Sequence, residues 1–286
     1  MSSQPAKIYY LGIDGGGTRC RARVRDEAGT LVGEAEGGLA NIHQALDSAL
    51  ANIVATAKAA AGNIPLGQIH AGLGLAGATG PEQCARVERA ALPFASVKVD
   101  SDGCAACLGA HRGGDGGIVI AGTGSAGFAL IKGQRFSLGG HGFVLGDQGS
   151  GAVMGRALLQ QALLAHDGIV TASAATRAVM AQFHDTPAEL VEWSRTALSR
   201  DYAAFTPRIF AAAAQGDKVA LAIVHKAATG LASMARQLLR AGAPRLSLIG
   251  GLVPAITPYL APDITAALSA PLADPLEGAL LLARQV

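Results

Sequence analysis

The residues Asp14, Gly15, Gly16, Gly17 and Thr18 combine a carboxylate, three glycines and a hydroxyl directly after an apolar stretch. Glycine lacks a Cβ, so backbone N–H groups in such a turn can approach phosphate oxygens closely, and Thr18 adds a hydroxyl donor. Asp14 would repel a phosphate directly, but it can bind one through a hydrated Mg²⁺, an ion that takes few protein ligands. The alternative is an ordinary hairpin turn in which Asp14 binds local amides. Both interpretations are open for this motif alone.

A second glycine turn, formed by Gly122, Thr123, Gly124 and Ser125, also follows an apolar run. Two such turns can hold a polyphosphate from both sides, because each presents backbone N–H groups without intervening side chains. The second turn therefore favours phosphate binding over the hairpin interpretation of the first turn.

The segment 72–77, GLGLAG, matches the G-x-G-x-x-G pattern of dinucleotide-binding proteins, and Asp100 follows at roughly the spacing of a ribose-binding acid. That pattern belongs at the first strand of a βαβ unit, whereas three expected strands and a helix precede it here. We therefore interpret these glycines as close packing of a core strand. The P-loop pattern G-x-x-x-x-G-K-[ST] does not occur in the sequence.

The elements that must position these residues follow from hydrophobic periodicity. Arginines alternate with small apolar residues over 19–25, as is typical of a strand with one solvent-exposed face. The spacing of Leu46, Leu50, Ile53 and Ala57 is typical of a helix. In the first half we expect strands at 7–14, 19–25, 30–36, 69–75 and 97–99, and helices at 43–61, 81–92 and 102–111.

After a glycine-rich break at 112–117, the same pattern begins again. We interpret the chain as one β-β-β-α-β-α-β-α unit used twice, an α/β fold whose facing copies would leave a cleft with both glycine turns at its floor. The predicted domains are 1–112 and 113–274, and the C-terminal helix 275–286 is expected to pack back on the first domain. In the second half we expect strands at 118–121, 128–131, 135–138 and 246–249, a helical insertion over about 151–242, and a helix from about 275.

The composition narrows the classes of function. Half of the 286 residues are apolar, so a large core is available, and the formal net charge is only +2. Because no basic stripe with interleaved aromatic residues is present, we expect no nucleic acid partner. We also expect no signal peptide and no membrane-spanning segment, and therefore a cytoplasmic protein. The four cysteines are too few for a disulfide framework, and we interpret the Cys104 and Cys107 pair as buried core rather than a metal or redox site.

Several segments, in this order along nearly the whole chain, resemble the bacterial glucosamine kinases of the BadF/BadG/BcrA/BcrD-type ATPase group. This group lies within the actin-like ATPase and sugar-kinase superfamily, which also includes the eukaryotic N-acetylglucosamine kinases. The matching segments are GIDGGGTRCRARV at 12–24, ANI at 40–42, DSDGCAACLGAH at 100–111, IAGTGSAG at 120–127, GDQGSGAVMG at 146–155, the helical stretch at 193–210, GG at 250–251 and LEGALLLA at 276–283.

The resemblance implies duplicated actin-like, ribonuclease H-like domains flanking an ATP cleft, with ATP and Mg²⁺ as cofactors. It makes 14–18 and 122–124 the two phosphate loops, with Asp14 holding Mg²⁺ through water, and it places Gly250 and Gly251 at the adenosine. It gives Asp102 the role of catalytic base, although an N-cap of the following helix is the common alternative for such an aspartate. The implied sugar-binding residues are Asn41, Asp102, Ser125, Gly140, His141 and Asp147.

The implied reaction moves the γ-phosphoryl group of ATP to glucosamine and forms glucosamine 6-phosphate, which requires positioning, charge neutralisation and a proton acceptor. N-acetylglucosamine kinases tend to carry Trp at the place of His141 and Glu at that of Gln148, so these two positions favour the free amine. N-acetylglucosamine or N-acetylmuramic acid is the alternative substrate. A sugar sensor or a non-kinase activator ATPase of the same fold is the alternative class.

Two further points stay open at this stage. Asp147 lies between glycines, where a turn or a cap of the helix beginning near residue 151 explains it as well as sugar binding does. The expected partner is a small amino hexose, and a homodimer is one of the oligomeric states that the sequence leaves open.

Overall fold

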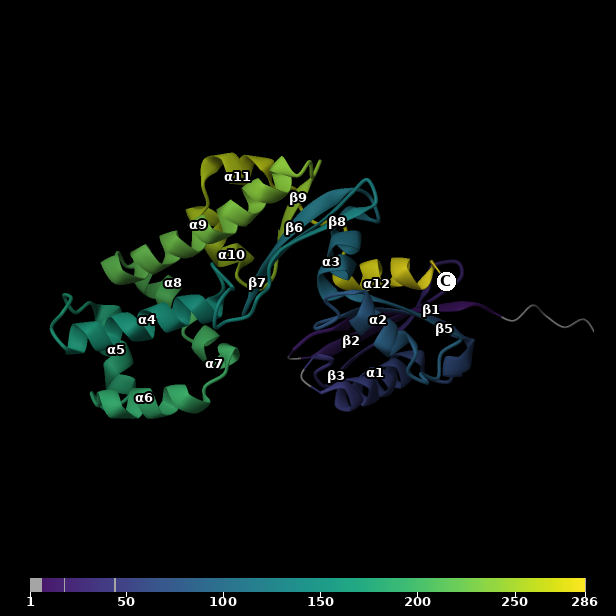
Figure 1. Cartoon of the computed structure of the whole chain (residues 1–286), viewed down its shortest axis with the longest axis horizontal. Helices are drawn as coiled ribbons and strands as arrows, with labels where there is room; N and C mark the ends of the chain where they lie inside the picture. Colours follow the sequence, from purple (N-terminus) through teal and green to yellow (C-terminus); the bar gives the residue numbers. More distant parts are fainter. Residues whose placement is uncertain (1–6, 18, 44, 286) are drawn as a thin grey trace, which may run out of the picture. The chain divides into compact units, whose positions relative to one another are not determined.

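A computed structural model describes residues 7–17, 19–43 and 45–285 of the chain. The chain divides into two compact units, whose elements are labelled in Figure 1. Unit 1 holds the described residues through Gly116, the segment Ala129–Arg135 and the chain from Ala270 onward. Unit 2 holds Gly117–Phe128 and Phe136–Ser269. Unit 1 thus includes the C-terminal helix. It also includes the short segment Ala129–Arg135, which the sequence-based prediction placed with the second half.

Unit 1 is built on a five-stranded sheet with the order β3-β2-β1-β4-β5. β1 pairs antiparallel with β2 and parallel with β4, and β5 extends the sheet parallel to β4. Because β1, β4 and β5 run in the same direction, their carboxyl ends meet at one edge of the sheet. The strands are β1 Tyr9–Gly15, β2 Cys20–Asp26, β3 Leu31–Gly37, β4 Ile69–Leu75 and β5 Ser96–Ser101.

Helices cover both faces of this sheet (Figure 1). α1, Leu46–Ala61, packs on β2 and β3, whereas α3, Asp102–His111, packs against α12, Pro275–Ala283, which lies on β1 and β4. α2, Pro81–Glu88, contacts β5, and a 3₁₀ turn at Leu66–Gln68 leads into β4.

Two predicted helix boundaries are wrong by several residues. α1 begins at Leu46 rather than at 43, because the preceding segment forms a turn in which Asn41 Oδ1 accepts a hydrogen bond from His43 N. α2 ends at Glu88 rather than at 92, and the chain leaves the helix in a turn in which Ala90 N donates to Val87 O at 3.0 Å.

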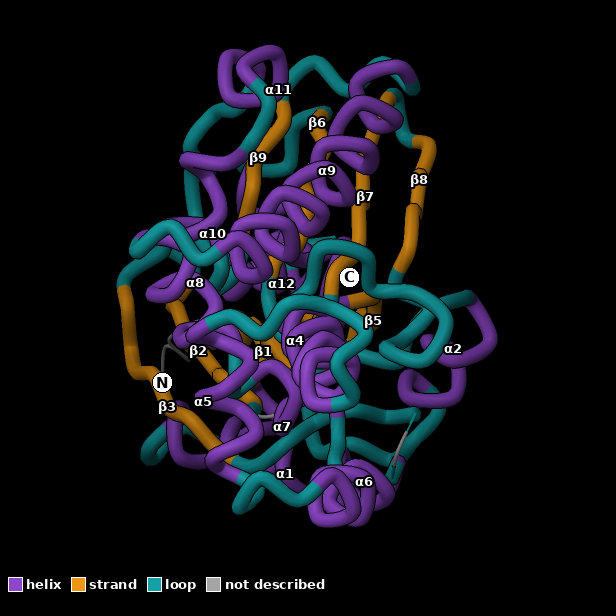
Figure 2. Tube along the Cα trace, turned by 90° about the vertical axis from the view of Figure 1, so that its left-hand side faces the viewer, coloured by secondary structure: helices purple, strands orange, loops and turns teal. Residues whose placement is uncertain are grey.

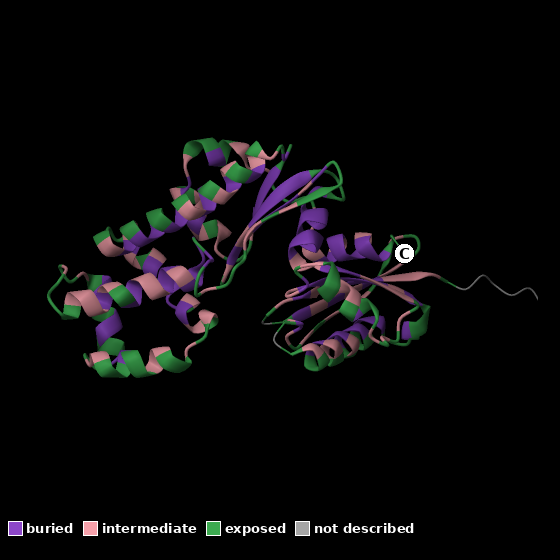
Figure 3. Ribbon diagram, viewed as in Figure 1, coloured by how far each residue is buried: buried purple, intermediate pink, exposed green. Residues whose placement is uncertain are grey.

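Glycines allow α12 to pack at backbone distance on the sheet and on α3. A Cβ at Gly72 of β4 would lie 1.9 Å from the carbonyl oxygen of Ala279, and a Cβ at Gly278 would lie 1.8 Å from that of Ala105. The interpretation of 72–77 as close packing of a core strand is therefore confirmed. Figure 3 shows that α3 and α12 are largely buried.

Arginines of β2 hold the first turn of α12. Arg23 donates to Asp274 at 2.8 and 2.9 Å and to Glu277 at 2.8 Å, and Arg25 reaches Glu277 at 2.5 Å. Asp274 also caps α12, because its Oδ1 accepts from Glu277 N at 3.0 Å. The expectation of solvent on this face of β2 is wrong at Arg23, whose side chain is only 15% exposed beneath these acids.

The second sheet has four strands in the order β8-β7-β6-β9, drawn in orange in Figure 2, and β6 runs parallel to β9. A full second copy of the unit would have a fifth strand. Among the described residues its place holds only a bridge between Leu246 and Leu268, followed by a hydrogen bond from Ser269 N to Leu246 O. Pro271 has no N–H to continue that pairing. The strands are β6 Gly116–Ala121, β7 Ser125–Ile131, β8 Gln134–Gly139 and β9 Leu246–Ile249.

The expected insertion is wholly helical apart from its connections, and its breaks are those that the sequence indicates. Pro187 and Pro207 lie in the first turns of helices, and Gly168 and Gly216 adopt positive φ after helix ends. None of the helices in the described ranges is both long and apolar enough to cross a bilayer. The helices are α4 Gly151–His166, α5 Ala174–Gln182, α6 Pro187–Thr196, α7 Ser199–Ala203, α8 Thr206–Ala214 and α9 Lys218–Arg240.

Short helices lie between β9 and α12, where the sequence-based prediction assigned no element. They are α10, Val253–Ile256, a 3₁₀ turn at Thr257–Tyr259, and α11, Pro262–Ala267. Each has a proline in its first turn, a start signal that the sequence does carry. These helices are too short to be predicted from hydrophobic periodicity.

Replacing Asp274 by Ala is expected to lower the free energy of unfolding by about 1–2 kcal/mol, because the change removes a helix cap and the partner of a half-buried arginine. Burial acts to raise the pKa of Asp274, but the hydrogen bonds from Arg23 and Glu277 N outweigh it and lower that pKa. The contribution is therefore present above the ordinary aspartate pKa, about 4, and is lost as the pH falls through the lowered value. Urea unfolding followed by circular dichroism, at pH 7 and at acid pH, measures both effects.

Asp263 supplies the matched control, since it also forms a two-bond pair with an arginine, Arg236, but on the surface. Asp263→Ala should change the urea midpoint much less than Asp274→Ala. Hydrogen exchange should quicken in α12 only for the Asp274 variant. Equal midpoints for the two variants would contradict an anchoring role for Asp274.

Candidate active site

Two acidic side chains lie at the carboxyl edge of the parallel strands in unit 1. Asp14 is in β1 and pairs in register with Gly74 of β4, which in turn pairs with Asp100 of β5. Asp102 follows β5 directly and begins α3. The strand register therefore places Asp14 and Asp102 at the same edge of the sheet, and the charge of Asp14 acts to raise the pKa of Asp102. Ligand sites of α/β proteins typically form at this edge of a parallel sheet.

Asp14 is paired with an arginine across the β1–β2 hairpin. Arg21 donates to Asp14 Oδ2 through Nη2 at 2.5 Å and through Nε at 3.1 Å. Both contacts use the same oxygen, so within the described chain Oδ1 keeps its lone pairs for another ligand. The described residues contain no group of three or more His, Cys, Asp or Glu side chains able to hold a metal. A single free carboxylate oxygen fits Mg²⁺ held mainly by waters and phosphates.

The turn after β1 only partly matches the predicted phosphate loop. Gly15 belongs to the strand, and its missing Cβ makes room for Leu75, which would lie 2.6 Å away. Gly16 N donates to Arg19 O at 2.9 Å and closes the turn, whereas Gly17 is exposed. Thr18 lies outside the described residues.

Asn41 lies on a loop that is hydrogen-bonded to the same edge of the sheet. The neighbouring amides donate to this edge, Ala40 N to Gly16 O at 3.0 Å and Ile42 N to Ala76 O at 3.1 Å. The loop therefore holds Asn41 beside the ends of β1 and β4, in the same unit as Asp14 and Asp102.

The cap interpretation of Asp102 is wrong, because Ser101 caps α3. Ser101 Oγ accepts from Cys104 N at 3.0 Å, whereas Asp102 Oδ1 accepts only from the adjacent Gly103 N at 2.8 Å. Burial, together with the charge of Asp14, raises the pKa of Asp102 above the ordinary aspartate value, although the Gly103 amide opposes this shift. Asp102 therefore does not cap α3, and its carboxylate binds a proton more readily than an ordinary aspartate does.

Asp100 forms an ion pair that the sequence did not predict. This role differs from the ribose contact of a dinucleotide site, which the glycine pattern at 72–77 suggested and which we rejected. Asp100 is almost fully buried in β5 and accepts two hydrogen bonds from Arg135, at 2.6 and 3.0 Å. Arg135 lies on β8, far away along the chain, and no signal in the sequence joins the two. The buried carboxylate of Asp100 is thus paired with the exposed side chain of Arg135, beside the two candidate site acids.

The second glycine turn, in unit 2, is joined to the start of α4. Gly151 N donates to Gly122 O at 2.9 Å, and Ala152 N donates to Thr123 O at 3.2 Å. Gly122 N is itself used by Gly124 O at 3.0 Å. These bonds fix the turn, and they use the first amides of α4 for this purpose.

Ser125, Gly140 and Asp147 lie together in unit 2. Gly140 N donates to Ser125 O at 3.2 Å, and Ser125 Oγ donates to Gln148 O at 2.8 Å. Asp147 is buried with φ at 61°, a conformation that is uncommon outside glycine. A Cβ at Gly124 would lie 3.0 Å from Asp147 Oδ2, so this glycine gives the carboxylate its room.

Asp147 is a turn residue and not a helix cap, since Ser150 caps α4 by accepting from Val153 N at 3.2 Å. Burial raises the pKa of Asp147, while the amides of Ser125 and Gly142 and the charge of His141 act in the opposite direction. The side chains of His141 and Gln148 are exposed.

Gly250 and Gly251 follow β9 and differ in their surroundings. Gly250 has φ at 110°, and a Cβ there would lie 2.4 Å from Ala121 O, so only glycine fits. Gly251 is exposed, with no atom within 4 Å of the place of a Cβ. The first glycine is explained by packing on β6, and the second leaves open space for a ligand.

Cys104 and Cys107 are buried free thiols in α3, and Cys107 Sγ donates to Gly116 O at 3.3 Å. Burial raises the pKa of Cys107 to about 11 and raises that of Cys104 further. Thiols in this state are poor nucleophiles and poor metal ligands, so the core interpretation is confirmed.

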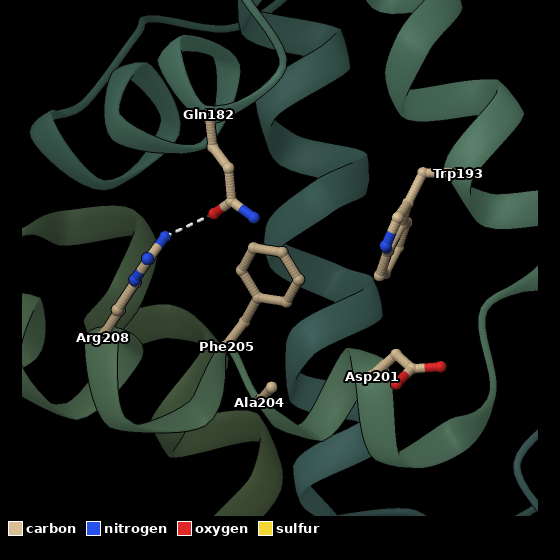
Figure 4. A pocket seen from close by; sticks show the side chains of 6 residues that line it. All are labelled: Gln182, Trp193, Asp201, Ala204, Phe205 and Arg208. Atoms are coloured by element: carbon tan, nitrogen blue, oxygen red, sulfur yellow. Dashed lines mark hydrogen bonds between the residues drawn. The ribbon is translucent and has the colours of Figure 1, made fainter.

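A hollow of about 260 Å³ lies among the insertion helices, and its lining contains none of the predicted site residues (Figure 4). The rings of Phe205 and Trp193 lie along it, and Arg208 donates to Gln182 at its rim. The lining residues are Gln182, Trp193, Asp201, Ala204, Phe205 and Arg208.

Comparison with known proteins gives consistent results. Residues 11–283 match the family model described as the BadF/BadG/BcrA/BcrD ATPase family. The glucosamine kinase GspK of Vibrio cholerae is 42% identical over 280 residues, which cover 96% of this chain and 95% of that protein. A solved structure from Chromobacterium violaceum, provisionally named an N-acetylglucosamine kinase, has a TM-score of 0.91 and 34% identity over 98% of this chain and all of that one.

A more distant structure shows the fold alone. The ROK family glucokinase of Streptomyces griseus, solved with glucose and AMPPNP, has a TM-score of 0.58 and 22% identity, covering 97% of this chain and 100% of that one. The expected two-domain α/β architecture of actin-like sugar kinases is confirmed by these matches.

Replacing Asp102 by Asn is expected to raise the thermal midpoint of unfolding at pH 7, because it removes a half-buried charge whose ionised form is disfavoured by burial and by Asp14. The raised pKa means that the ionised form costs folding free energy above that pKa and that this cost disappears below the ordinary aspartate value, about 4. The gain should therefore shrink as the pH is lowered toward 4. Calorimetry at both pH values measures it, with the exposed Asp47→Asn in α1 as control. A lower midpoint for Asp102→Asn at pH 7 would contradict the assignment of a half-buried, destabilising carboxylate.

Proposed function

Because the chain belongs to the BadF/BadG/BcrA/BcrD ATPase family, we propose that it phosphorylates an amino hexose with ATP, and that glucosamine is converted to glucosamine 6-phosphate. The 42% identity to a glucosamine kinase over almost all of both chains supports this substrate. ATP as the phosphoryl donor also supports a cytoplasmic location.

The observation that carries the proposal is the contrast between the two carboxylates at the edge of the first sheet. Asp14 is paired with Arg21, while Asp102 is half-buried, does not cap α3, and has a pKa raised by burial and by the charge of Asp14. Two acids in such different surroundings are typical of active sites in which one acid transfers a proton and the other binds charge.

Asp102 would act as the general base. Its carboxylate accepts the proton of the sugar 6-hydroxyl as that oxygen forms a bond to the γ-phosphorus, and the bond from the γ-phosphorus to the β,γ-bridging oxygen breaks, with its electron pair leaving on ADP. A pKa above the ordinary value makes Asp102 a better proton acceptor near neutral pH.

Charge neutralisation and positioning are assigned to the glycine turns. We assign Asp14, the turn 15–18, and Gly122, Thr123 and Gly124 to the phosphates, and Gly250 and Gly251 to the adenosine. When bound, Mg²⁺ would neutralise phosphate charge, held through water by the free Oδ1 of Asp14. Arg21 keeps that carboxylate oriented by holding its other oxygen at 2.5 Å.

We assign sugar recognition to Asn41, Ser125, Gly140, His141 and Asp147, with Asp102 at the reacting hydroxyl. Buried Asp147 supplies a carboxylate that can accept hydrogen bonds from adjacent hydroxyls, and sites of that kind discriminate strongly against analogues that lack a hydroxyl. Exposed His141 and Gln148 leave the amine position without a bulky aromatic ring. N-acetylglucosamine is the second candidate, favoured by the similarity to the Chromobacterium structure.

A coupled assay of ADP formation tests the function. With glucosamine, N-acetylglucosamine, N-acetylmuramic acid and glucose as acceptors, the highest kcat/KM is expected for glucosamine, and removal of Mg²⁺ with EDTA should abolish turnover. A higher value for N-acetylglucosamine would replace the substrate. Sugar binding by calorimetry without ADP formation would indicate a sensor, and visible iron–sulfur absorbance after anaerobic purification would indicate an activator ATPase.

Asp102→Asn should reduce kcat by about 10²- to 10⁴-fold, because the amide cannot accept the proton. The Kd of ATP, measured by isothermal calorimetry, should change by less than about twofold, since the substitution leaves the phosphate loops intact. The matched Asp47→Asn should keep wild-type kinetics. A kcat within a few-fold of wild type would remove Asp102 from the role of base.

A further inference from the structure

The segment 140–148 carries three of the proposed sugar-binding residues, yet it contains no helix or strand. Its path depends on left-handed backbone at Gly140, Gly142 and Asp147. Val144 and Leu145 are 79% and 84% exposed, so they contribute no packing that would hold the segment. Gly146 N donates to Gly142 O at 2.7 Å within the segment, and one side chain between these glycines joins its middle part to the insertion helices.

Phe143 provides that contact. Its ring centroid lies 4.8 Å from the ring of Tyr202, and the guanidinium carbon of Arg156 lies 4.8 Å from the same Phe143 ring. Arg156 Nη1 also donates to the carbonyl oxygen of Phe143 at 3.1 Å. The Phe143 ring thus contacts the Tyr202 ring and the Arg156 guanidinium. The same guanidinium binds the backbone of Phe143.

Close helix packing places Tyr202 and Arg156 next to each other. Arg156 lies on α4 and Tyr202 on α7, and a Cβ at Gly155 would lie 1.9 Å from the carbonyl oxygen of Tyr202. Thr206 Oγ1, at the first residue of α8, donates to Gly151 O at 3.2 Å. Gly155 of α4 thus allows α7 to pack at backbone distance.

Tyr202 is itself part of an aromatic cluster. Its ring lies 5.0 Å from that of Trp193, which lies 5.8 Å from Phe205 and 5.7 Å from Phe183. Figure 4 shows Trp193 and Phe205 along the hollow of the insertion. Trp193 is the single tryptophan of the chain, so its fluorescence reports on this cluster.

We propose that Phe143, held by Arg156 and Tyr202, is a positioning residue that orders the segment 140–148 and so presents Asp147 and His141 to the sugar. The inference rests on the proposed function, since it assigns a support to the same sugar-binding residues. Without the Phe143 contact, the segment would sample many conformations, and sugar binding would have to supply the ordering free energy.

Phe143→Ala is the direct test. The KM for glucosamine is expected to rise about tenfold or more, while the KM for ATP stays within about twofold, because the Phe143 ring supports only the sugar segment. Phe143→Tyr keeps the ring and should restore a KM near wild type. Phe210→Ala is the matched control, since it removes a half-buried ring of the same unit whose contact is Tyr259. A wild-type sugar KM for Phe143→Ala would overturn the proposal, as would an equal rise for both substrates.

Two readouts do not require turnover. Hydrogen exchange over 140–148 should quicken in Phe143→Ala and not in Phe210→Ala, and unchanged exchange would overturn the proposal. Glucosamine titrated without nucleotide should change Trp193 fluorescence, with a midpoint about tenfold higher in Phe143→Ala.

The outcomes separate the two hypotheses. If the wild-type protein phosphorylates no amino sugar, the proposed function fails while the exchange measurement still decides whether Phe143 orders the segment. If the wild type is active and Phe143→Ala keeps its sugar KM, only the positioning role fails. Should Phe143→Ala not fold, Arg156→Gln removes the cation and the backbone contact and leaves the ring, and it is held to the same sugar-specific rise in KM.

Discussion

The structure of unit 1 depends on the packing of α12 at backbone distance on β1, β4 and α3. Carbonyl oxygens of α12 occupy the places where side chains at Gly12 and Gly72 would otherwise lie. Arg23 and Arg25 of β2 then bind the acids of its first turn. The last helix of the chain thereby becomes part of the first core, and it covers the face of the sheet opposite α1.

This packing holds the parallel strands in place, and both candidate acids lie at their carboxyl edge. Asp14 is held by Arg21 on one oxygen, and Asp102 follows the strand that carries the buried Asp100, which is paired with the exposed Arg135.

Much of unit 1 and the presence of the insertion helices could be predicted from the sequence, because periodicity and turn residues act over a few neighbours. Signals from single residues were less decisive. Both Ser101 and Asp102 are good helix caps, and only the observed bond from Cys104 N to Ser101 Oγ separates them. The alternation of β2 correctly identifies its core face, but it cannot show that acids distant in sequence cover Arg23 and Arg25.

Local patterns in the sequence were sufficient to predict the order of the strands and longer helices of unit 1, the two glycine turns and the acid at the end of the first strand, since each follows from local backbone preference and residue spacing. Long-range packing decides which acid lacks a capping role, which arginine pairs with Asp14, and which ring contacts the insertion helices from the segment 140–148. Those outcomes depend on contacts between residues far apart in the chain. Their free energies arise from burial and charge that no local pattern encodes.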